Sequence, residues 1–313
     1  MSVLVTGCAG FIGSKVSEFL LQEGKQVVGV DNLNDYYDPK LKNYRLEQIK
    51  KQGGSFNFYM LDIENKTALM DIFKQHTFDV VYHLAARTGV RASLLDPMGY
   101  MQTNVLGVLN ILGCMRNFSV KKLVFSSTSS LYAGQSMPFV ETMSTDKPIS
   151  PYAASKKAAE VMCYAYHHLC QLDVSVVRCF TVYGPYGRPD MSPDLFMKNI
   201  YYGTPLNLYG DGSQLRDFTY INDIARGILL ASKPLGYEII NLGSEQPHTI
   251  NEMIEIIERF LNKKAKINYL PFNGFDVKDT WASNARAKEV FGWRPEIDFE
   301  NGLGKMVYAF LEY

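Results

Sequence analysis

Six short apolar runs, separated by helix-like stretches, limit most strongly how this chain can fold. The runs are rich in β-branched residues, whereas the stretches between them carry apolar residues at helical spacing. The runs cover residues 3–5, 27–30, 56–60, 79–83, 122–126 and 174–179, and the helical stretches cover about 12–23, 39–51, 66–75, 98–117 and 151–171. Strands that alternate with helices form a parallel sheet with helices on both faces. The pattern therefore predicts an α/β fold with a Rossmann-type, doubly wound parallel sheet.

The regular alternation ends near residue 180. Residues 183–190 are rich in glycine and proline, and shorter strand and helix candidates follow them. No repeat or flexible linker separates the two parts. We therefore expect a Rossmann-type domain over residues 1–180 and a smaller α/β domain over residues 181–313, packed against each other with some interleaving of the chain.

The first apolar run leads into a glycine-rich turn of the kind that binds nucleotides. Gly7, Gly10 and Gly13 have G-x-x-G-x-x-G spacing, and apolar residues at helical spacing follow directly. Glycines in such a turn let the backbone approach a pyrophosphate, whose charge is stabilised by free amides and by the dipole at a helix N-terminus. A tight turn without a ligand is the plainer interpretation of the glycines alone.

Asp31 ends the second run, at about the distance downstream where dinucleotide sites place the carboxylate that binds the ribose. A carboxylate accepts hydrogen bonds from both ribose hydroxyls and would repel a 2′-phosphate, so the sequence favours NAD over NADP. An aspartate that only caps a turn is the alternative. Asp62 follows the third run, and we expect it to contact the adenine. The cofactor-binding candidates are Gly7, Gly10, Phe11, Ile12, Gly13, Asp31, Asn32, Asp62, Ile63, Leu84, Ala85, Ala86, Tyr152 and Lys156.

Tyr152 and Lys156 are a candidate catalytic pair. Four-residue spacing on the helix expected at 151–171 places a phenol beside an ammonium group. Ionising a free tyrosine at neutral pH costs roughly 4 kcal/mol, and a fixed cation nearby lowers that cost. The spacing therefore predicts a tyrosine that acts as a base, although an exposed polar pair on an ordinary helix gives the same pattern.

Composition argues against several other classes of protein. The 32 basic residues balance the 32 acidic ones, and no basic block exceeds a few residues, so nucleic acid is not an expected partner. No apolar stretch approaches the roughly 20 residues that span a bilayer, and the chain starts at once with a strand, so we expect a cytoplasmic protein without a membrane contact. The five cysteines and five histidines are scattered, which favours buried free thiols over a metal site.

These motifs together resemble the extended short-chain dehydrogenase/reductases and, within them, the UDP-glucuronate 4-epimerases. The resemblance covers essentially the whole chain. It is carried by residues 7–13, 31–38, 83–86, 89–91, 152–156, 180–191 and 216–220. The Asn-Asp-Tyr-Tyr-Asp run at 34–38 and the Gly-Arg-Pro-Asp-Met run at 187–191 are similar to the uronate subgroup in particular.

The resemblance implies a mechanism and a third catalytic residue. In this family a serine or threonine four positions before a tyrosine contacts the reacting hydroxyl, and here that position is Thr128, before Tyr132. Tyr152 would take the proton from the 4-hydroxyl of a UDP-sugar while NAD takes the hydride from carbon 4. The 4-keto sugar would turn over and receive the hydride on its opposite face. Lys156 would bind the nicotinamide ribose, and NAD would stay bound throughout.

The resemblance also implies how the substrate is held. Arg216 would hold the diphosphate, unless it forms a buried salt bridge with Asp217. Our own hypothesis is that Arg188 and Thr181, with Ser127 or Arg91, hold the carboxylate of a uronate; the alternative is that Arg188 faces solvent or binds phosphate. The substrate-binding candidates are Arg91, Ser127, Thr128, Tyr152, Thr181, Arg188, Asn207 and Arg216. Relatives pair as homodimers through two helices each, here 98–117 and 151–171. The apolar residues that fit such an interface are Val108, Ile111, Leu112, Val161 and Leu169, which core packing explains equally.

The residues after Thr128 bear on the type of reaction. Relatives that eliminate water carry an Asp-Glu pair there and those that decarboxylate carry a glutamate, whereas this chain has Ser129 and Ser130. We therefore expect 4-epimerisation, with UDP-glucuronate to UDP-galacturonate as the leading reaction. The alternatives are 4-epimerisation of UDP-glucose or UDP-N-acetylglucosamine, a UDP-uronate decarboxylase, a sugar-nucleotide dehydratase, and a non-catalytic NAD-binding sensor.

Overall fold

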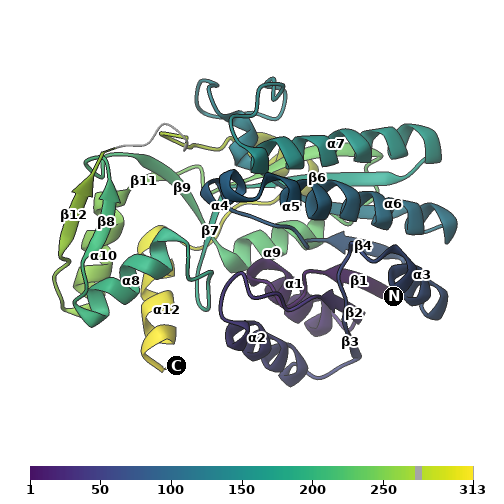
Figure 1. Cartoon of the computed structure of the whole chain (residues 1–313), viewed down its shortest axis with the longest axis horizontal. Helices are drawn as coiled ribbons and strands as arrows, with labels where there is room; N and C mark the ends of the chain where they lie inside the picture. Colours follow the sequence, from purple (N-terminus) through teal and green to yellow (C-terminus); the bar gives the residue numbers. More distant parts are fainter. Residues whose placement is uncertain (272–276, 313) are drawn as a thin grey trace.

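A seven-stranded parallel sheet forms the centre of the molecule (Figure 1). The computed structural model describes residues 1–271 and 277–312. The strand order is β10-β6-β5-β4-β1-β2-β3, with β1 at Ser2–Thr6, β2 at Gln26–Asp31, β3 at Phe56–Met60, β4 at Val80–His83, β5 at Lys122–Thr128, β6 at Asp173–Cys179 and β10 at Tyr237–Leu242. The order runs outward from β1 in both directions, which is the doubly wound arrangement that the alternating pattern predicted.

Helices cover both faces of this sheet and bury two apolar layers. In β1, the fully buried Val3 and Val5 contribute to one layer and Leu4 contributes to the other, because successive side chains of a strand point to opposite faces. The first layer is covered by α1 (Phe11–Gln22), α2 (Pro39–Lys51), α9 (Ile221–Leu230) and α11 (Ala285–Phe291), and the second by α3 (Lys66–Gln75), α6 (Gly107–Asn117) and α7 (Pro151–Cys170). The predicted α/β fold class is confirmed.

The helix expected at 98–117 is present from Pro97 to Asn117 and contains one π turn. Three short elements precede α6, namely α4 (Val90–Leu95), α5 (Pro97–Met101) and the π turn η1 (Gln102–Leu106). Within η1 the side chain of Asn104 pairs with the backbone of Arg87 in both directions, at 2.8 and 2.9 Å, and donates to Ser155 Oγ at 2.9 Å. The widened turn therefore ties the loop after β4 to the helix that carries Tyr152.

The chain after residue 180 builds a smaller unit and also returns to the large sheet. Its small sheets are β11-β9-β7 and β12-β8, with their helices to the left in Figure 1. The elements are β7 (Thr181–Tyr183), α8 (Ser192–Tyr202), β8 (Leu206–Tyr209), β9 (Leu215–Tyr220), β11 (Pro247–Thr249), α10 (Ile250–Leu261), β12 (Ile267–Leu270) and α12 (Phe299–Glu312). In contrast, α9, β10 and α11 pack on or join the seven-stranded sheet. The chain thus passes between the two units several times.

Candidate active site

One cavity of about 970 Å³ lies at the carboxyl ends of the central strands and extends to the small sheets. All of the cofactor-binding and substrate-binding candidates named above line it. They come from the ends of β1, β2, β3, β4 and β5, from α4 and α7, and from the segment after residue 180. Ligands of doubly wound sheets bind at this edge, so the geometry brings the predicted residues to the expected place.

The glycine turn at one end of the cavity packs too closely for any side chain. A Cβ on Gly13 would lie 2.0 Å from the carbonyl oxygen of Gly7, and Gly7 itself has a φ of +71°. Gly10 precedes α1 and has no side chain with which to cap that helix. The first amides of α1 therefore face the cavity without a side-chain partner, which is the arrangement that binds a phosphate group.

Asp31 is held next to this turn. Its Oδ2 accepts a hydrogen bond from Ala9 N at 3.1 Å and its Oδ1 accepts one from Leu33 N at 2.8 Å, while the residue is only 8% exposed. Each oxygen keeps a further lone pair that can accept a hydroxyl. Nearby, Asn32 Nδ2 donates to Asp62 Oδ2 at 2.7 Å. These acceptors fit the ribose of a dinucleotide.

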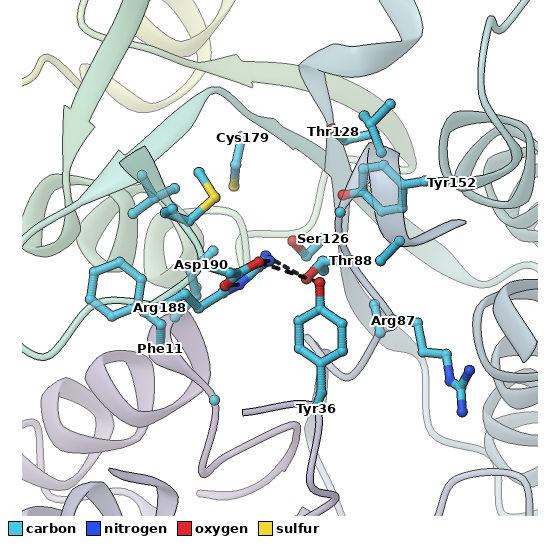
Figure 2. A pocket seen from close by; sticks show the side chains of 18 of the residues that line it. Phe11, Tyr36, Arg87, Thr88, Ser126, Thr128, Tyr152, Cys179, Arg188 and Asp190 are labelled. Atoms are coloured by element: carbon cyan, nitrogen blue, oxygen red, sulfur yellow. Dashed lines mark hydrogen bonds and ion pairs between the residues drawn. The ribbon is translucent and has the colours of Figure 1, made fainter. Parts of the chain in front are cut away.

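Tyr152 and Lys156 lie in the first two turns of α7. The helix begins with Pro151, and Ser150 caps it by accepting a hydrogen bond from Ala153 N at 3.2 Å. Burial raises the pKa of Tyr152, whereas a hydrogen bond from Thr128 and the positive charge of Arg188 lower it. Thr128 and Tyr152 lie close together in Figure 2. Arg188 is thus a second cation near this phenol, in addition to Lys156 one turn along the helix.

Lys156 is almost fully buried on the sheet side of the helix. Its Nζ lies 4.6 Å from the centre of the Phe125 ring, and burial lowers the pKa of this ammonium group to about 8. The neighbouring His83 stacks on the same ring. Lys156 therefore lines the sheet side of the cavity as a buried ammonium group with little access to solvent.

Arg188 reaches into the cavity from the turn after β7. Its Nε donates to Asp190 Oδ1 at 3.1 Å, its Nη2 forms an ion pair with Asp190 Oδ2, and its Nη1 donates to Thr88 Oγ1 (Figure 2). The guanidinium carbon lies 5.7 Å from the centre of the Tyr36 ring, and the Tyr36 hydroxyl donates to Asp190 Oδ2 at 3.3 Å. Arg188 is therefore a positioned cation at the substrate end of the cavity.

Comparison with known proteins assigns the chain to a family. Residues 4–306 match the protein family described as GDP-mannose 4,6 dehydratase. The chain belongs to this family. A UDP-glucuronate 4-epimerase from Thermodesulfobacterium geofontis is 58% identical over 305 residues, which cover 97% of this chain and 94% of that protein. UDP-glucuronate 4-epimerase 1 of Arabidopsis thaliana is 40% identical over an alignment that covers 100% of this chain and 77% of that protein.

Solved structures of the family share the whole fold. The UDP-glucuronic acid 4-epimerase of Bacillus cereus, in complex with UDP-glucuronic acid and NAD, superposes with a TM-score of 0.94 at 34% identity and covers 100% of both chains. The UDP-glucose 4-epimerase of Thermotoga maritima with UDP-glucose has a TM-score of 0.90 at 30% identity, covering 100% of this chain and 99% of that one. The resemblance to UDP-glucuronate 4-epimerases that the motifs indicated is confirmed.

The remaining substrate candidates line the cavity in different environments. Ser127 Oγ donates to Glu160 Oε1 at 2.6 Å, so its proton points behind the site. The guanidinium of Arg91 lies 4.2 Å from the Tyr209 ring centre, and Arg216 Nη1 donates to the carbonyl oxygen of Leu215 at 3.0 Å. Asn207 and Thr181 line the cavity wall formed by the small sheets.

Asp217, which the sequence offered as a salt-bridge partner for Arg216, has its carboxylate hydrogen-bonded to the backbone of other segments. The oxygens of Asp217 accept hydrogen bonds from the backbone N–H groups of Ser244, Glu245 and Ala282. Asp217 is fully buried, so these bonds take the place of water around its charge. It therefore joins the strand β9 to the loop after β10.

Several cavity residues of this family member were not among the candidates. They are Tyr36, Lys42, Thr88, Ser126, Cys179 and Asp190. Tyr36 and Asp190 belong to the two runs that resemble the uronate subgroup, so this resemblance could have identified them as site residues. Thr88 and Ser126 are ordinary strand-end or loop residues in sequence, and only the fold brings them to the site.

Two further observations limit the chemistry of the described residues. No group of three or more histidine, cysteine, aspartate or glutamate side chains in residues 1–271 and 277–312 is arranged to hold a metal ion. Within the same part of the chain, no helix combines the length and apolarity that crossing a membrane requires.

Proposed function

We propose that this protein converts UDP-glucuronate into UDP-galacturonate by NAD-dependent 4-epimerisation through a transient 4-keto sugar. The observation that carries the proposal is the common cavity: a dinucleotide-type glycine turn and Asp31 at one end, Tyr152 with Thr128 in the middle, and the cation Arg188 at the other end. Relatives named UDP-glucuronate 4-epimerases, and the Bacillus cereus complex with UDP-glucuronic acid and NAD, support it.

The residues of the first part of the cavity fit NAD. The first amides of α1 would hold the pyrophosphate, Asp31 a ribose, and Asn32 with Asp62 the adenine side. Lys156 would hold the nicotinamide ribose from below. NAD, when bound, supplies the acceptor and donor of the hydride at carbon 4. We propose that the segment 1–180 binds this cofactor and that the segment 181–313 supplies most contacts to the UDP-sugar.

Tyr152 is the proposed base. Its phenolate takes the proton from the 4-hydroxyl of the sugar and returns it to the same oxygen after the ring has turned over. Thr128 shares a hydrogen bond with the phenol and is placed to contact that sugar oxygen too. Because burial disfavours the phenolate, the compensating charge of Arg188 matters for the base as well as for binding.

Arg188 has a second proposed role at the carboxylate of the substrate. A 4-keto uronate is a β-keto acid, which loses carbon dioxide when its carboxylate is desolvated and turned perpendicular to the ketone. Charge-assisted hydrogen bonds from Arg188, with Thr181 and Arg91 nearby, would keep the carboxylate solvated and fix its plane. Arg216 and Asn207, on the small-sheet side, are the proposed contacts for diphosphate and uracil.

The description of the family names a dehydratase, and the site argues against that reaction here. Thr128 is followed by Ser129 and Ser130, and the Thr128 side chain caps this turn by accepting from Ser130 N at 3.1 Å. Among the described residues that line the cavity, the carboxylates are Asp31, Asp35, Asp62 and Asp190. Asp31 and Asp62 lie on the nucleotide side, Asp35 lies in the loop after β2 next to Tyr36, and Asp190 is paired with Arg188. None follows Thr128, so no acid or base is supplied there for elimination.

The proposal is tested by offering the purified holoenzyme UDP-glucuronate, UDP-glucose and UDP-N-acetylglucosamine separately and resolving the products by NMR. We expect UDP-galacturonate from the first and much slower conversion of the others. Conversion of UDP-glucose alone would assign the protein to the neutral epimerases, and no conversion of any substrate would favour a binding role.

Two properties complete the proposal. We propose that two copies pair through the helical layer that contains α7, where several apolar side chains are exposed, as related enzymes do. We also propose the cytoplasm as its location, because all five cysteines are free thiols and four of them are buried.

A further inference from the structure

An acidic side chain already pairs with the guanidinium that we assign to the substrate. Asp190 accepts hydrogen bonds from the Nε–H and from one Nη2–H of Arg188, while Thr88 accepts one from an Nη1–H. A guanidinium has five N–H groups. One N–H on Nη1 and one on Nη2 therefore have no partner among residues 1–271 and 277–312, and these two can donate hydrogen bonds to a substrate carboxylate.

The pair is built into the fold by three separate loops. Tyr36 comes from the loop after β2, Thr88 from the loop after β4, and Arg188 with Asp190 from the turn after β7 (Figure 2). The Tyr36 hydroxyl donates to Asp190, and its ring packs against the guanidinium. A Cβ on Gly89, where φ is +105°, would lie 2.9 Å from that hydroxyl. Tyr36 therefore contacts both members of the pair, and Thr88 holds Arg188 from the other loop.

The exposure of the two partners differs. The Arg188 side chain is 18% exposed and that of Asp190 is 39% exposed. A mostly buried guanidinium that loses its partner carries an uncompensated charge, which is costly. During turnover of the 4-keto sugar, the substrate carboxylate must leave Arg188 while the UDP group stays in place. At that moment Asp190 remains as the compensating charge.

We propose that Asp190 is a positioning and specificity-determining residue: it keeps Arg188 paired while the uronate turns over, and so prevents the guanidinium from holding the substrate carboxylate too tightly. This inference rests on the proposed function. With Asp190 present, one positive charge faces two carboxylates, and the substrate is held by two N–H groups. Without the charge of Asp190, the substrate carboxylate would be the sole counter-ion of Arg188, bound more strongly before turnover and released more slowly during it.

The proposal predicts a split between kcat and KM in Asp190→Asn. The amide has nearly the same size and still accepts a hydrogen bond from Arg188, but it has no charge. For UDP-glucuronate we expect KM and kcat each to fall by about 3- to 10-fold, because a contact made in the bound state and lost during turnover is strengthened. For UDP-glucose, which has no carboxylate, we expect KM to change by less than about 2-fold. The partial exposure of Asp190 keeps the expected effect moderate.

The control is Asp71→Asn, which removes the same charge from an exposed pair with Lys74 on α3, away from the cavity. It should leave both constants as in the unsubstituted enzyme. Asp190→Ser removes the same charge with a smaller side chain and serves if the amide variant does not fold. Affinity for UDP-glucuronate, measured by calorimetry in a Tyr152→Phe background, should rise when Asp190→Asn is added.

Three results can be told apart. A parallel fall of KM and kcat for UDP-glucuronate alone supports the role of Asp190. An unchanged or raised KM for UDP-glucuronate in Asp190→Asn, with normal NAD content, overturns it while leaving the epimerase activity intact. If the unsubstituted enzyme converts UDP-glucose and not UDP-glucuronate, the proposed function itself fails.

Discussion

Tyr152, the proposed base, can ionise at neutral pH only with help from its neighbours. The side chain is half-buried, and burial raises its pKa. Thr128 supplies a hydrogen bond and Arg188 a positive charge, and both favour the ionised form. Thr128 comes from the end of β5 and Arg188 from the turn after β7. The reactivity of this residue therefore depends on loops that meet only in the folded chain.

Replacing Tyr152 by phenylalanine tests its role directly. The variant loses the hydroxyl and keeps the ring, so we expect kcat to fall by on the order of 10²- to 10⁴-fold, the usual contribution of a positioned acid or base. The glycine turn, Asp31 and Lys156 are untouched, so the NAD content of the purified protein should remain. NMR of the UDP-sugar and extraction of the cofactor measure the two quantities. Turnover at the rate of the unsubstituted enzyme would remove Tyr152 from the mechanism.

Arg188→Ala tests the carboxylate contact. Loss of the guanidinium should lower kcat/KM for UDP-glucuronate by about 10- to 100-fold, since a charge-assisted bidentate contact contributes roughly 1.5–3 kcal/mol. With its carboxylate no longer fixed, the 4-keto sugar should also lose carbon dioxide, so mass spectrometry should find a UDP-pentose product. Arg259→Ala on α10, where the side chain is 61% exposed and paired with Glu300, is the control. An unchanged rate without pentose would exclude the contact.

Local patterns predicted the residues of the site whose roles depend on near neighbours in sequence. The glycine turn and the spacing of Tyr152 and Lys156 are set within a few residues, so the sequence was enough to find them. In contrast, the Tyr36 hydroxyl meets Asp190 across 154 positions of sequence. The proton of Ser127 points to Glu160, which lies on another element. Such pairings depend on tertiary packing, which no local pattern contains.

At the scale of elements, a buried ion pair joins α7 to the sheet behind the catalytic residues. Glu160 on α7 accepts from Arg178 on β6 at 3.0 and 2.7 Å and from Ser127 on β5 at 2.6 Å. Arg178 Nη1 also donates to the Tyr132 hydroxyl at 2.8 Å. The two charged side chains are only 2–3% exposed. The network therefore fixes the helix that carries Tyr152 against the strand that ends in Thr128.

Removing the negative charge from this pair should destabilise the protein. Glu160→Gln leaves Arg178 buried without compensation, for which we expect a loss of about 3–5 kcal/mol in the free energy of unfolding. Urea unfolding followed by circular dichroism measures it. Glu47→Gln, in an exposed pair with Lys50 on α2, is the matched control and should change stability by less than about 1 kcal/mol. Equal effects of the two substitutions would contradict the structural role of the network.

Asp194, in the first turn of α8, gives stability a dependence on pH. Burial raises the pKa of this carboxyl from 3.8 to about 7, although Lys198 and Arg45 oppose the shift. Between these two values the folded protein holds a proton that the unfolded chain has lost, so this group makes stability fall as pH rises. Relative to Asp194→Asn, the unsubstituted protein should lose about 2–3 kcal/mol between pH of about 4.5 and 7.5, measured by urea unfolding. A constant difference between the two proteins would contradict the shift.

The six strands predicted from the alternating apolar runs are present, but the seventh strand of the large sheet, β10, was not predicted. β10 pairs in parallel with β6, and its Ile240 and Leu242 are fully buried. It follows α9 in the chain, as the other strands of this sheet follow helices, but the irregular segment before it concealed the repeat. A short apolar run alone does not show which sheet it joins, because that depends on the return of the chain from the small unit.

At the scale of the whole molecule, the same return of the chain connects the segment 1–180 to the small unit, the two parts to which we assign cofactor and substrate. α9 and α11 complete the apolar layer that α1 begins, and β10 covers the edge of β6. The segment 1–180 alone would therefore expose the face of α1 that packs against α9. The two ends of the cavity are fixed relative to each other by this shared core, as hydride transfer between a bound cofactor and a sugar requires.

An exposed apolar surface on the helical layer of α4, α5 and α7 supports pairing of two copies. Of the five residues named from sequence, Val108, Ile111 and Leu112 are buried in the core, whereas Val161 and Leu169 are 54% and 76% exposed. The surface also includes Leu95, Met98, Leu106 and Tyr164, which are 89%, 67%, 54% and 55% exposed. α4 and α5 pack directly on α7, so these side chains belong to one layer of the molecule (Figure 1). Apolar surface of this extent is typical of an interface.

The double variant Val161→Arg with Leu169→Glu tests this interface. Both side chains lie on one face of α7, eight residues apart, so charges there would have to be buried between the two copies. We expect light scattering to give the mass of a dimer for the unsubstituted protein and that of a monomer for the variant. Tyr308→Arg with Leu311→Glu, on the exposed face of α12, makes the same exchange elsewhere and should leave the dimer intact. If the α7 variant keeps the dimer mass and the α12 variant loses it, the copies pair through the small unit instead.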